Sequence, residues 1–382
     1  MAVVGMLTVA LPSVASVLPA KFVVTKSQCV EVADDGTCAR YDDKPVAYAL
    51  IPSAAQPVEP RLTVTGTTTY PSSGQILFVT VSQPPITLLD WFVARDNPAA
   101  RLWTYTDKYG TSTPEQQLRS GQRQMTGAKD RATYVALKAA GFDVQRTLGP
   151  AVVDYVVCMK QNDKGTKCLE EAPAASLLQP DDVITKVNGL DIATIEDIPK
   201  ALADVKAGDE VDVELRRGSD TVTGRVKTVL AEGEATPRTI LGFVPIDTTL
   251  VVLPEGLSVE FDTGSIGGPS AGLAFTLTLI DTVTPGQLMG NQRVAVTGEI
   301  DIDGNVGAIG GLNSKASAVK QMGVKYFLVP ASQPETGNDS VAAARRVVGD
   351  DVEVIPVATL EEALAVLVRL GGDPLPASGV SA

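Results

Sequence analysis

Residues 267–272 read Gly267-Gly268-Pro269-Ser270-Ala271-Gly272, in a chain of 382 residues that contains no histidine. The last five of them fit the G-x-S-x-G elbow of serine hydrolases, in which a histidine normally serves as the general base. Because this chain has no histidine, another side chain must accept the proton if Ser270 is a nucleophile. A neutral lysine is the obvious substitute, and Lys315 is the candidate.

Pro269 and the flanking glycines Gly267 and Gly268 favour a tight turn into a helix that begins near Ser270. The positive end of that helix and the N–H groups of residues 267–270 would then stabilise an oxyanion. Two other interpretations stay open. Ser270 could simply cap the helix. An α/β-hydrolase esterase would use the same elbow, but it would also need a histidine.

Two more blocks follow: Val296-Thr297-Gly298-Glu299-Ile300, and residues 304–315, which end at Lys315. With residues 267–272, and in this order and spacing, they resemble the proteolytic domain of Lon proteases. The resemblance implies peptide-bond hydrolysis through an acyl-enzyme, with Ser270 as nucleophile and Lys315 as general base. It also implies that the hydroxyl of Thr297 hydrogen-bonds the lysine.

Lys315 must be neutral to accept a proton, whereas the pKa of a free lysine is about 10.4. Burial and a nearby positive potential both favour the neutral amine. We expect Asn313 or Ser314 to cap a helix, which places Lys315 in its first turn, where the helix dipole disfavours an ammonium. Lys320 and Lys325 are the alternatives nearby, and we expect both to face solvent.

Residues 141–228 resemble a PDZ domain, which captures a peptide C-terminus as an added strand and holds its carboxylate with backbone N–H groups. Gly141 and Phe142 would belong to the carboxylate loop. Asp143 follows where the family commonly has a second glycine, and its charge would repel a carboxylate. A domain that only positions the protease is therefore an equally good interpretation.

Residues 1–20 carry no charged side chain, and Lys21 is the first. A helix of this length would span about 30 Å, the hydrocarbon thickness of a bilayer. The segment is interpreted as a single-pass transmembrane anchor, or as a signal peptide cleaved after Ala15. A buried core helix is the third alternative. Anchor and signal peptide both predict a cell-membrane or exported protein whose catalytic domain is extracytoplasmic.

The four cysteines form two close pairs, Cys29 with Cys38 and Cys158 with Cys168. Each pair brackets a polar stretch that resembles a loop tip, which favours two disulfides in an oxidising compartment. The spacings do not fit a zinc or redox Cys-x-x-Cys site, so we expect no metal. Four unrelated free thiols are the alternative.

The net charge of −13 argues against nucleic acid as a partner. No G-x-x-x-x-G-K-[ST] loop occurs, so neither a nucleotide nor another cofactor is expected. The predicted division is 1–20 anchor or signal, 21–140 N-terminal extracytoplasmic region, 141–228 PDZ-like domain, 239–370 Lon-like domain and 371–382 disordered tail. Strands alternate with helices in 239–370, and the predicted class is α+β.

The architecture is similar to that of bacterial Lon-like proteases with a membrane segment and a PDZ domain. It predicts an ATP-independent serine endopeptidase that acts on proteins or peptides outside the cytoplasm. The alternative is a non-catalytic peptide-binding or scaffold protein on a degenerate Lon-like fold. The sequence leaves a homo-oligomer open.

Overall fold

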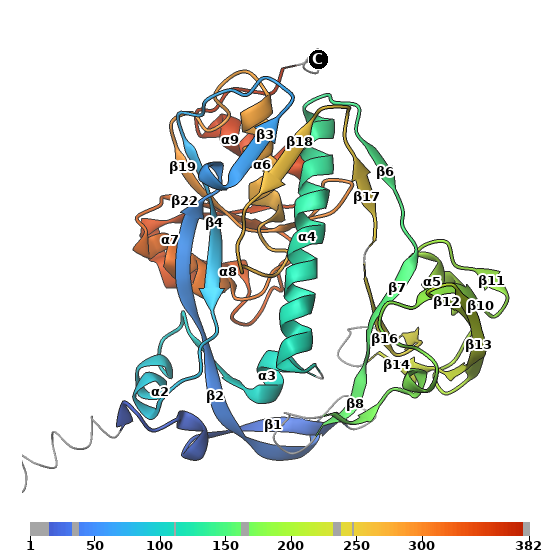
Figure 1. The fold of residues 1–382 in the computed structure, drawn as a ribbon. Coiled ribbons are helices and arrows are strands. Elements are labelled where there is room, and N and C mark those ends of the chain that lie inside the picture. Colours follow the sequence, from blue (N-terminus) through green and yellow to red (C-terminus); the bar gives the residue numbers. More distant parts are fainter. Residues whose placement is uncertain are drawn as a thin grey trace, which may run out of the picture.

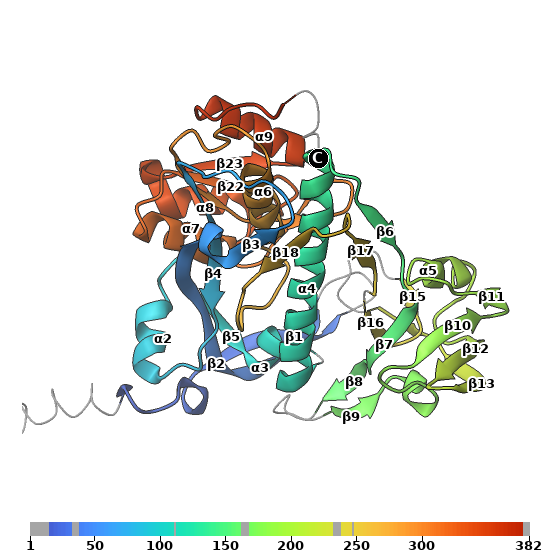
Figure 2. The same cartoon turned by 45° about the horizontal axis from the view of Figure 1, so that its top comes forward.

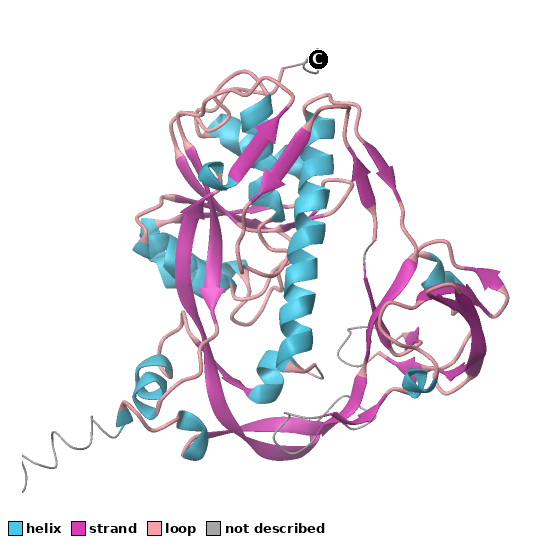
Figure 3. Cartoon of the chain, viewed as in Figure 1, coloured by secondary structure: helices cyan, strands magenta, loops and turns pink. Residues whose placement is uncertain are grey.

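The computed structural model describes residues 15–32, 38–110, 112–161, 168–231, 238–246 and 248–376. For residues 29–32, 38–39 and 161 it describes the backbone alone. The strands of the described part form one large sheet, one smaller sheet and several two-stranded ribbons (Figures 1 and 3).

The large sheet is mixed and has the order β1-β2-β4-β19-β22-β23, with β5 paired to β2. Its strands are β1 (Thr25–Val32), β2 (Cys38–Pro57), β4 (Gln75–Ser82), β5 (Arg101–Thr104), β19 (Arg293–Val296), β22 (Tyr326–Pro330) and β23 (Glu353–Val357). The four strands from β4 to β23 are parallel, whereas β1, β2 and β5 pair antiparallel. This mixture of pairings agrees with the α+β class predicted from the sequence.

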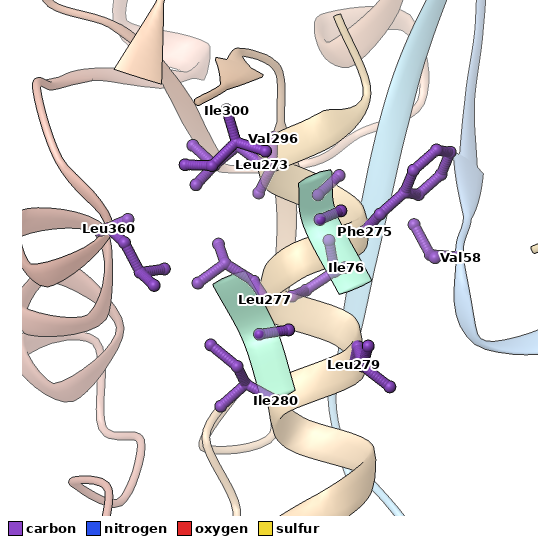
Figure 4. Packing of buried hydrophobic residues seen from close by; sticks show 14 of the residues in the cluster. Val58, Ile76, Leu273, Phe275, Leu277, Leu279, Ile280, Val296, Ile300 and Leu360 are labelled. Carbon is purple, nitrogen blue, oxygen red and sulfur yellow. The ribbon is translucent and has the colours of Figure 1, made fainter. Parts of the chain in front are cut away.

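Helices cover both faces of the large sheet, which explains why β4 is apolar at successive positions. Ile76 and Phe78 point into a core shared with α4 (Pro114–Ala139), α6 (Gly272–Val283) and α9 (Leu360–Arg369). Figure 4 shows α6 side chains meeting residues of the sheet and of α9 in this core. Leu77 and Val79 point into a second core, which they share with α7 (Leu312–Gln321) and α8 (Val341–Val348).

The sequence-based division places residues 21–140 apart from residues 239–370, but the structure joins them. β2 and β4 belong to the same sheet as β19, and α4 packs on α6. β6 (Gln145–Thr147) then leaves this body, and β17 (Leu250–Val252) returns antiparallel to it. Everything between these two strands is therefore an insertion, which stands to one side of the body (Figures 1 and 2).

The inserted sheet has the order β13-β12-β10-β7-β16, with β11 paired to β10. Its elements are β7 (Ala151–Val156), β10 (Val183–Val187), β11 (Leu190–Asp191), α5 (Asp197–Ala201), β12 (Glu210–Arg217), β13 (Asp220–Lys227) and β16 (Phe243–Ile246). β16 pairs with β7, so the sheet extends beyond the boundary predicted at residue 228.

Shorter elements complete the described part of the chain. The helices are η1 (Ala20–Phe22), η2 (Glu59–Arg61), α2 (Leu88–Ala94), α3 (Tyr105–Tyr109), η3 (Pro173–Ser176) and η4 (Gly349–Asp351). The strands are β3 (Leu62–Thr65), β8 (Cys158–Gln161), β9 (Cys168–Glu171), β14 (Val229–Leu230), β15 (Thr239–Ile240), β18 (Ser258–Phe261), β20 (Glu299–Ile300) and β21 (Val306–Gly307).

The predicted cysteine pairing is confirmed where it can be followed. Cys158 and Cys168 form a disulfide between β8 and β9, with their Cα atoms 5.8 Å apart. The side chains of Cys29 and Cys38 lie outside the described part, so their pairing stays a prediction.

Most of the predicted segment 1–20 also lies outside the described residues. From Ala15 to Pro376, leaving aside the short gaps, no helix is long and apolar enough to cross a membrane. The end of the segment belongs to the folded body, because Leu18 O accepts a hydrogen bond from Leu88 N (2.8 Å) and Ala20 N donates to Ile86 O (3.0 Å).

The start of the C-terminal tail is ordered, contrary to the prediction of disorder from residue 371. Asp373 N donates to Gln287 O (2.9 Å), and Gln287 N donates to an Asp373 carboxylate oxygen (2.8 Å). Leu375 packs against the main core. Residues 377–382 lie outside the described part.

Candidate active site

Ser270 sits in a loop that is fixed to the end of strand β19. Helix α6 begins at Gly272 with Ala271 as N-cap, so Ser270 precedes the helix by two residues. The carbonyl oxygen of Ser270 accepts from Gly298 N (2.9 Å) and from Thr297 Oγ1 (3.0 Å). These two bonds hold the half-buried Ser270 at the positive end of α6.

Helix α4 supports the same loop from the other side. Gly268 N donates to Gly121 O at 2.8 Å, which ties the loop to the N-terminal third of α4. A Cβ on Gly267 would lie 3.1 Å from Gly121 C and 3.2 Å from Gly121 O. These distances are shorter than ordinary contacts, so a side chain at this position would require the two backbones to shift apart by a few tenths of an ångström.

Lys315 comes from the first turn of α7, as expected, but another residue caps this helix. Gly311 is the N-cap, in the left-handed region at φ 73°, and Leu312 N donates to Asp339 Oδ1 at 3.0 Å. Asn313 and Ser314, the predicted caps, instead donate to carbonyls of the loop before β5. Lys315 itself is buried, with an exposed fraction of 3%.

The side chains of Ser270, Lys315 and Thr297 meet at one point. Lys315 Nζ lies 2.7 Å from Ser270 Oγ and 3.0 Å from Thr297 Oγ1. Since the only hydroxyl proton of Thr297 is donated to the Ser270 carbonyl, Thr297 can only accept from the amine. One N–H of Lys315 is thereby directed at Thr297, and a neutral amine keeps a lone pair for the proton of Ser270.

The surroundings of Lys315 favour the neutral amine. Burial lowers the pKa of Lys315 to about 7, and the nearby carboxylates of Glu299 and Asp339 act more weakly in the opposite direction. Burial also raises the pKa of the Glu299 carboxyl, against the charges of Arg131 and Lys315. Near neutral pH a substantial fraction of Lys315 is therefore able to accept a proton.

Gly141 and Phe142 lie away from any peptide groove, contrary to the sequence-based interpretation. Gly141 N donates to Lys138 O (3.1 Å) and Phe142 N to Leu137 O (2.9 Å), so these N–H groups terminate helix α4. Phe142 packs on the main core of the body. Neither N–H group is free to hold a carboxylate.

A groove of about 480 Å³ lies instead between α5 and β16 of the insertion. Ile198 of α5 and Leu202, the C-cap of this helix, line it together with Phe243 and Val244 of β16 and with residues 238–241. β16 is an edge strand of its sheet, so its outer side can pair with an extended peptide. The run Leu241-Gly242-Phe243 could have indicated this groove from the sequence. Leu241 and Phe243 line it, and the glycine between them adopts a positive φ of 84°.

Both the main body and the insertion match known protein-family models. Residues 251–369 match the Lon protease (S16) C-terminal proteolytic domain, and residues 157–228 match the PDZ domain. The chain therefore carries a Lon-type serine peptidase domain and a PDZ domain. The PDZ domain is the insertion described above, and Ser270, Thr297 and Lys315 all lie within the matched Lon-type region.

Curated relatives support the same assignment. Lon protease from Neorickettsia sennetsu is 37% identical over 112 residues, which are 29% of this chain and 12% of that protein. Lon protease from Lachnoclostridium phytofermentans is 33% identical over 112 residues, again 29% of this chain and 12% of that protein. Lon protease from Ureaplasma parvum is 29% identical over 213 residues, 50% of this chain and 26% of that protein. The chain thus corresponds to about a quarter or less of these relatives' length.

Among solved structures, the PDZ domain of an SdrC-like protein from Listeria monocytogenes matches 26% of this chain and 90% of its own, at 20% identity and a TM-score of 0.21. The second domain of the Listeria protein Lin2157 covers 27% of this chain and 88% of its own, at 22% identity and a TM-score of 0.19.

Sequence reasoning missed several residues that shape the Lon-type site. Gly121 lies far from Ser270 in the chain and in a polar helix, and nothing in its neighbourhood signals the contact with the nucleophile loop. The sequence around Asp339 likewise gives no sign that this residue caps α7. Glu299 was visible only as part of the block that contains Thr297. In the described part of the chain, no group of acidic or cysteine side chains has the arrangement of a metal site.

Of the predicted oxyanion donors in residues 267–270, two are not available. Pro269 has no N–H, and the N–H of Gly268 is donated to Gly121. The N–H groups of Gly267 and Ser270 remain as candidates.

Proposed function

We propose that this chain is a serine endopeptidase that hydrolyses peptide bonds with a Ser270–Lys315 dyad and without ATP. The observation that carries the proposal is the 2.7 Å contact between Ser270 Oγ and a lysine amine that is buried and has a lowered pKa. A lysine kept only for structure would be expected to pair with a carboxylate, whereas this amine has two hydroxyls as its hydrogen-bond partners.

In the proposed reaction, neutral Lys315 takes the proton of Ser270 while Ser270 Oγ attacks the carbonyl carbon of the scissile bond. The tetrahedral oxyanion is stabilised by the backbone N–H groups of Gly267 and Ser270 in the loop before α6. The ammonium of Lys315 then protonates the leaving amine, which gives the acyl-enzyme and a neutral lysine. Lys315 finally activates a water molecule, which attacks the acyl carbon. The ester bond to Ser270 then breaks, Ser270 regains its proton, and the product leaves as a carboxylate.

The proposed location is the outer side of a cell membrane. The disulfide between Cys158 and Cys168 supports an oxidising compartment. The absence of charge from residues 1–20 supports an anchor or an export signal. The proposed partners are protein or peptide substrates, which the groove between α5 and β16 would hold as an added strand.

The proposal is tested by labelling the purified chain with a fluorophosphonate and by measuring cleavage of an unfolded protein. Labelling at Ser270 and cleavage that is lost in Ser270→Ala are expected. Addition of ATP and magnesium should leave the rate unchanged. A chain that neither reacts with the label nor cleaves, but still binds peptides, would be the non-catalytic scaffold instead.

A further inference from the structure

Helix α2 exposes an apolar stripe to solvent. Leu89, Phe92 and Val93 have exposed fractions of 39%, 58% and 68%, and their spacing of i, i+3 and i+4 places them on one face. The other face is also apolar, because Trp91 packs on a small core around Val46 and Ile86. The buried face explains how α2 is attached, but it leaves the outward stripe unexplained.

A second apolar segment lies beside this stripe. Val17, Phe22 and Val23 are 74%, 70% and 58% exposed. The two backbone hydrogen bonds of Leu18 and Ala20 described above join this segment to the start of α2. We call the six exposed side chains the α2–η1 surface: Val17, Phe22, Val23, Leu89, Phe92 and Val93.

Cationic side chains lie over the aromatic rings of this surface. Arg95 Cζ is 4.3 Å from the centroid of the Phe92 ring, and Lys21 Nζ is 5.4 Å from that of Phe22. Apolar and aromatic side chains flanked by Lys and Arg are typical of segments that lie in the headgroup region of a bilayer. Arg95 also forms an ion pair with the adjacent Asp96, with Nε 3.0 Å from Oδ2, so Lys21 is the relevant cation of this surface.

The uncharged segment of the chain leads directly into this surface. Residues 1–20 contain no charged side chain, and the described chain begins at Ala15, next to η1 and α2. Figures 1 and 2 both show α2 and η1 together at one end of the molecule, away from the PDZ domain. A lipid surface fits better than a protein partner, because the segment that continues from the surface is itself uncharged and mostly apolar.

We propose that the α2–η1 surface lies in the headgroup region of a lipid bilayer and fixes how the Lon-type domain is oriented on it. The inference rests on the proposed membrane location, and it goes further by naming the face in contact. Phe22 and Phe92 enter the boundary between headgroups and acyl chains, while Lys21 faces lipid phosphates.

The chain contains two tryptophans, and Trp91 lies within α2, so its fluorescence reports on this surface. The full chain with Trp103→Phe is mixed with vesicles of phosphatidylcholine and phosphatidylglycerol that carry brominated acyl chains. Bromine should quench Trp91. The double variant Phe92→Asp/Val93→Asp should lose most of this quenching and still float with the vesicles. A control variant, Leu169→Asp/Leu190→Asp, changes two equally exposed side chains of the PDZ domain and should leave the quenching unchanged.

Flotation without quenching of Trp91 would overturn the inference and leave the membrane location intact. Failure of the chain to float would overturn both. Unchanged quenching in the double variant would also contradict the inference, as would a dimer that the same substitutions dissociate. Cleavage of a soluble peptide shows that each variant is folded, and Phe92→Ser/Val93→Ser serves as a milder pair if the aspartates prevent folding.

Discussion

The amine of Lys315 is buried, which disfavours its charged form. The neutral amine that burial favours is the form that can accept a proton. With an exposed fraction of 3% and a pKa lowered to about 7, Lys315 exchanges protons in the range where a general base is most effective. Thr297 orients the amine through a hydrogen bond, and Lys315 Nζ lies 2.7 Å from Ser270 Oγ. At the residue scale the site is therefore a buried base with two hydroxyl partners.

Acylation should rise with pH through the pKa of Lys315 near 7, because only the neutral amine accepts the proton of Ser270. Lys315→Arg should be inactive at every pH, since a guanidinium does not deprotonate in proteins. Thr297→Val should show an intermediate rate. The measurement is the single-turnover acylation rate against pH. Near-normal acylation by Lys315→Arg would move the base to another residue.

Burial of Lys315 should also lower the stability of the fold. A pKa of about 7 in the folded chain, against 10.5 in the unfolded chain, costs on the order of 5 kcal/mol at pH 6, where both states are protonated. The cost falls as pH rises from 7 and vanishes near 10.5. Lys315→Met should therefore raise the free energy of unfolding at pH 6 by about 2 kcal/mol or more, after the loss of two hydrogen bonds.

Urea unfolding of Lys315→Met and of the wild type at pH 6 and pH 9 measures this gain. The gain should be smaller at pH 9. Lys320→Met is a matched control in the same helix, because Lys320 is partly exposed and pairs with Asp351. A gain that does not depend on pH would contradict a lowered pKa at Lys315.

At the scale of elements, helix α4 and the nucleophile loop are in backbone contact. A methyl group on Gly267 would meet the backbone of Gly121 at 3.1 Å, whereas a methyl group on Gly121 would find Gly267 Cα at 3.8 Å, an ordinary contact distance. The contact is therefore asymmetric, and the two alanine substitutions can be compared directly.

Gly267→Ala should displace Ser270 by a few tenths of an ångström and reduce acylation by about tenfold or more, since attack depends steeply on position. Gly121→Ala should keep its activity and gain about 0.5–1 kcal/mol from helix propensity. Acylation rates and thermal unfolding of both variants test this contrast. Equal losses of activity, or no loss in Gly267→Ala, would show that the contact does not position the nucleophile.

The catalytic residues can be predicted from the sequence more accurately than the residues that hold them in place. Ser270, Thr297 and Lys315 were found because a nucleophile, its base and the residue that directs the base lie in short ordered blocks. The cap of α7 was predicted wrongly, because a glycine in the left-handed region and Asp339, distant in the chain, replaced the local candidates Asn313 and Ser314. The peptide groove was misplaced for a similar reason, since Gly141-Phe142 serves as a helix terminus.

At the scale of the whole molecule, the PDZ domain is inserted into the Lon-type body and contacts α4, the helix that also contacts the nucleophile loop. The sequence suggested separate consecutive domains, because the pairing of β2 and β4 with β19 leaves no local signal. Besides the ribbon of β6 and β17, side-chain contacts join the parts. Arg123 of α4 forms an ion pair with Asp154 of β7, and Ser112 Oγ lies 3.2 Å from the Tyr155 hydroxyl.

The ion pair between Arg123 and Asp154 should fix the PDZ domain against α4. The Asp154 side chain is only 5% exposed, so Arg123→Ala leaves a buried carboxylate without this partner and should cost about 1–3 kcal/mol of the contact. Amide hydrogen exchange should then increase in β7 and in the first half of α4, while α7 stays protected. Arg119→Ala, an exposed arginine one turn earlier in the same helix, is the control and should change neither. Unchanged exchange in Arg123→Ala would mean that this ion pair does not fix the position of the PDZ domain.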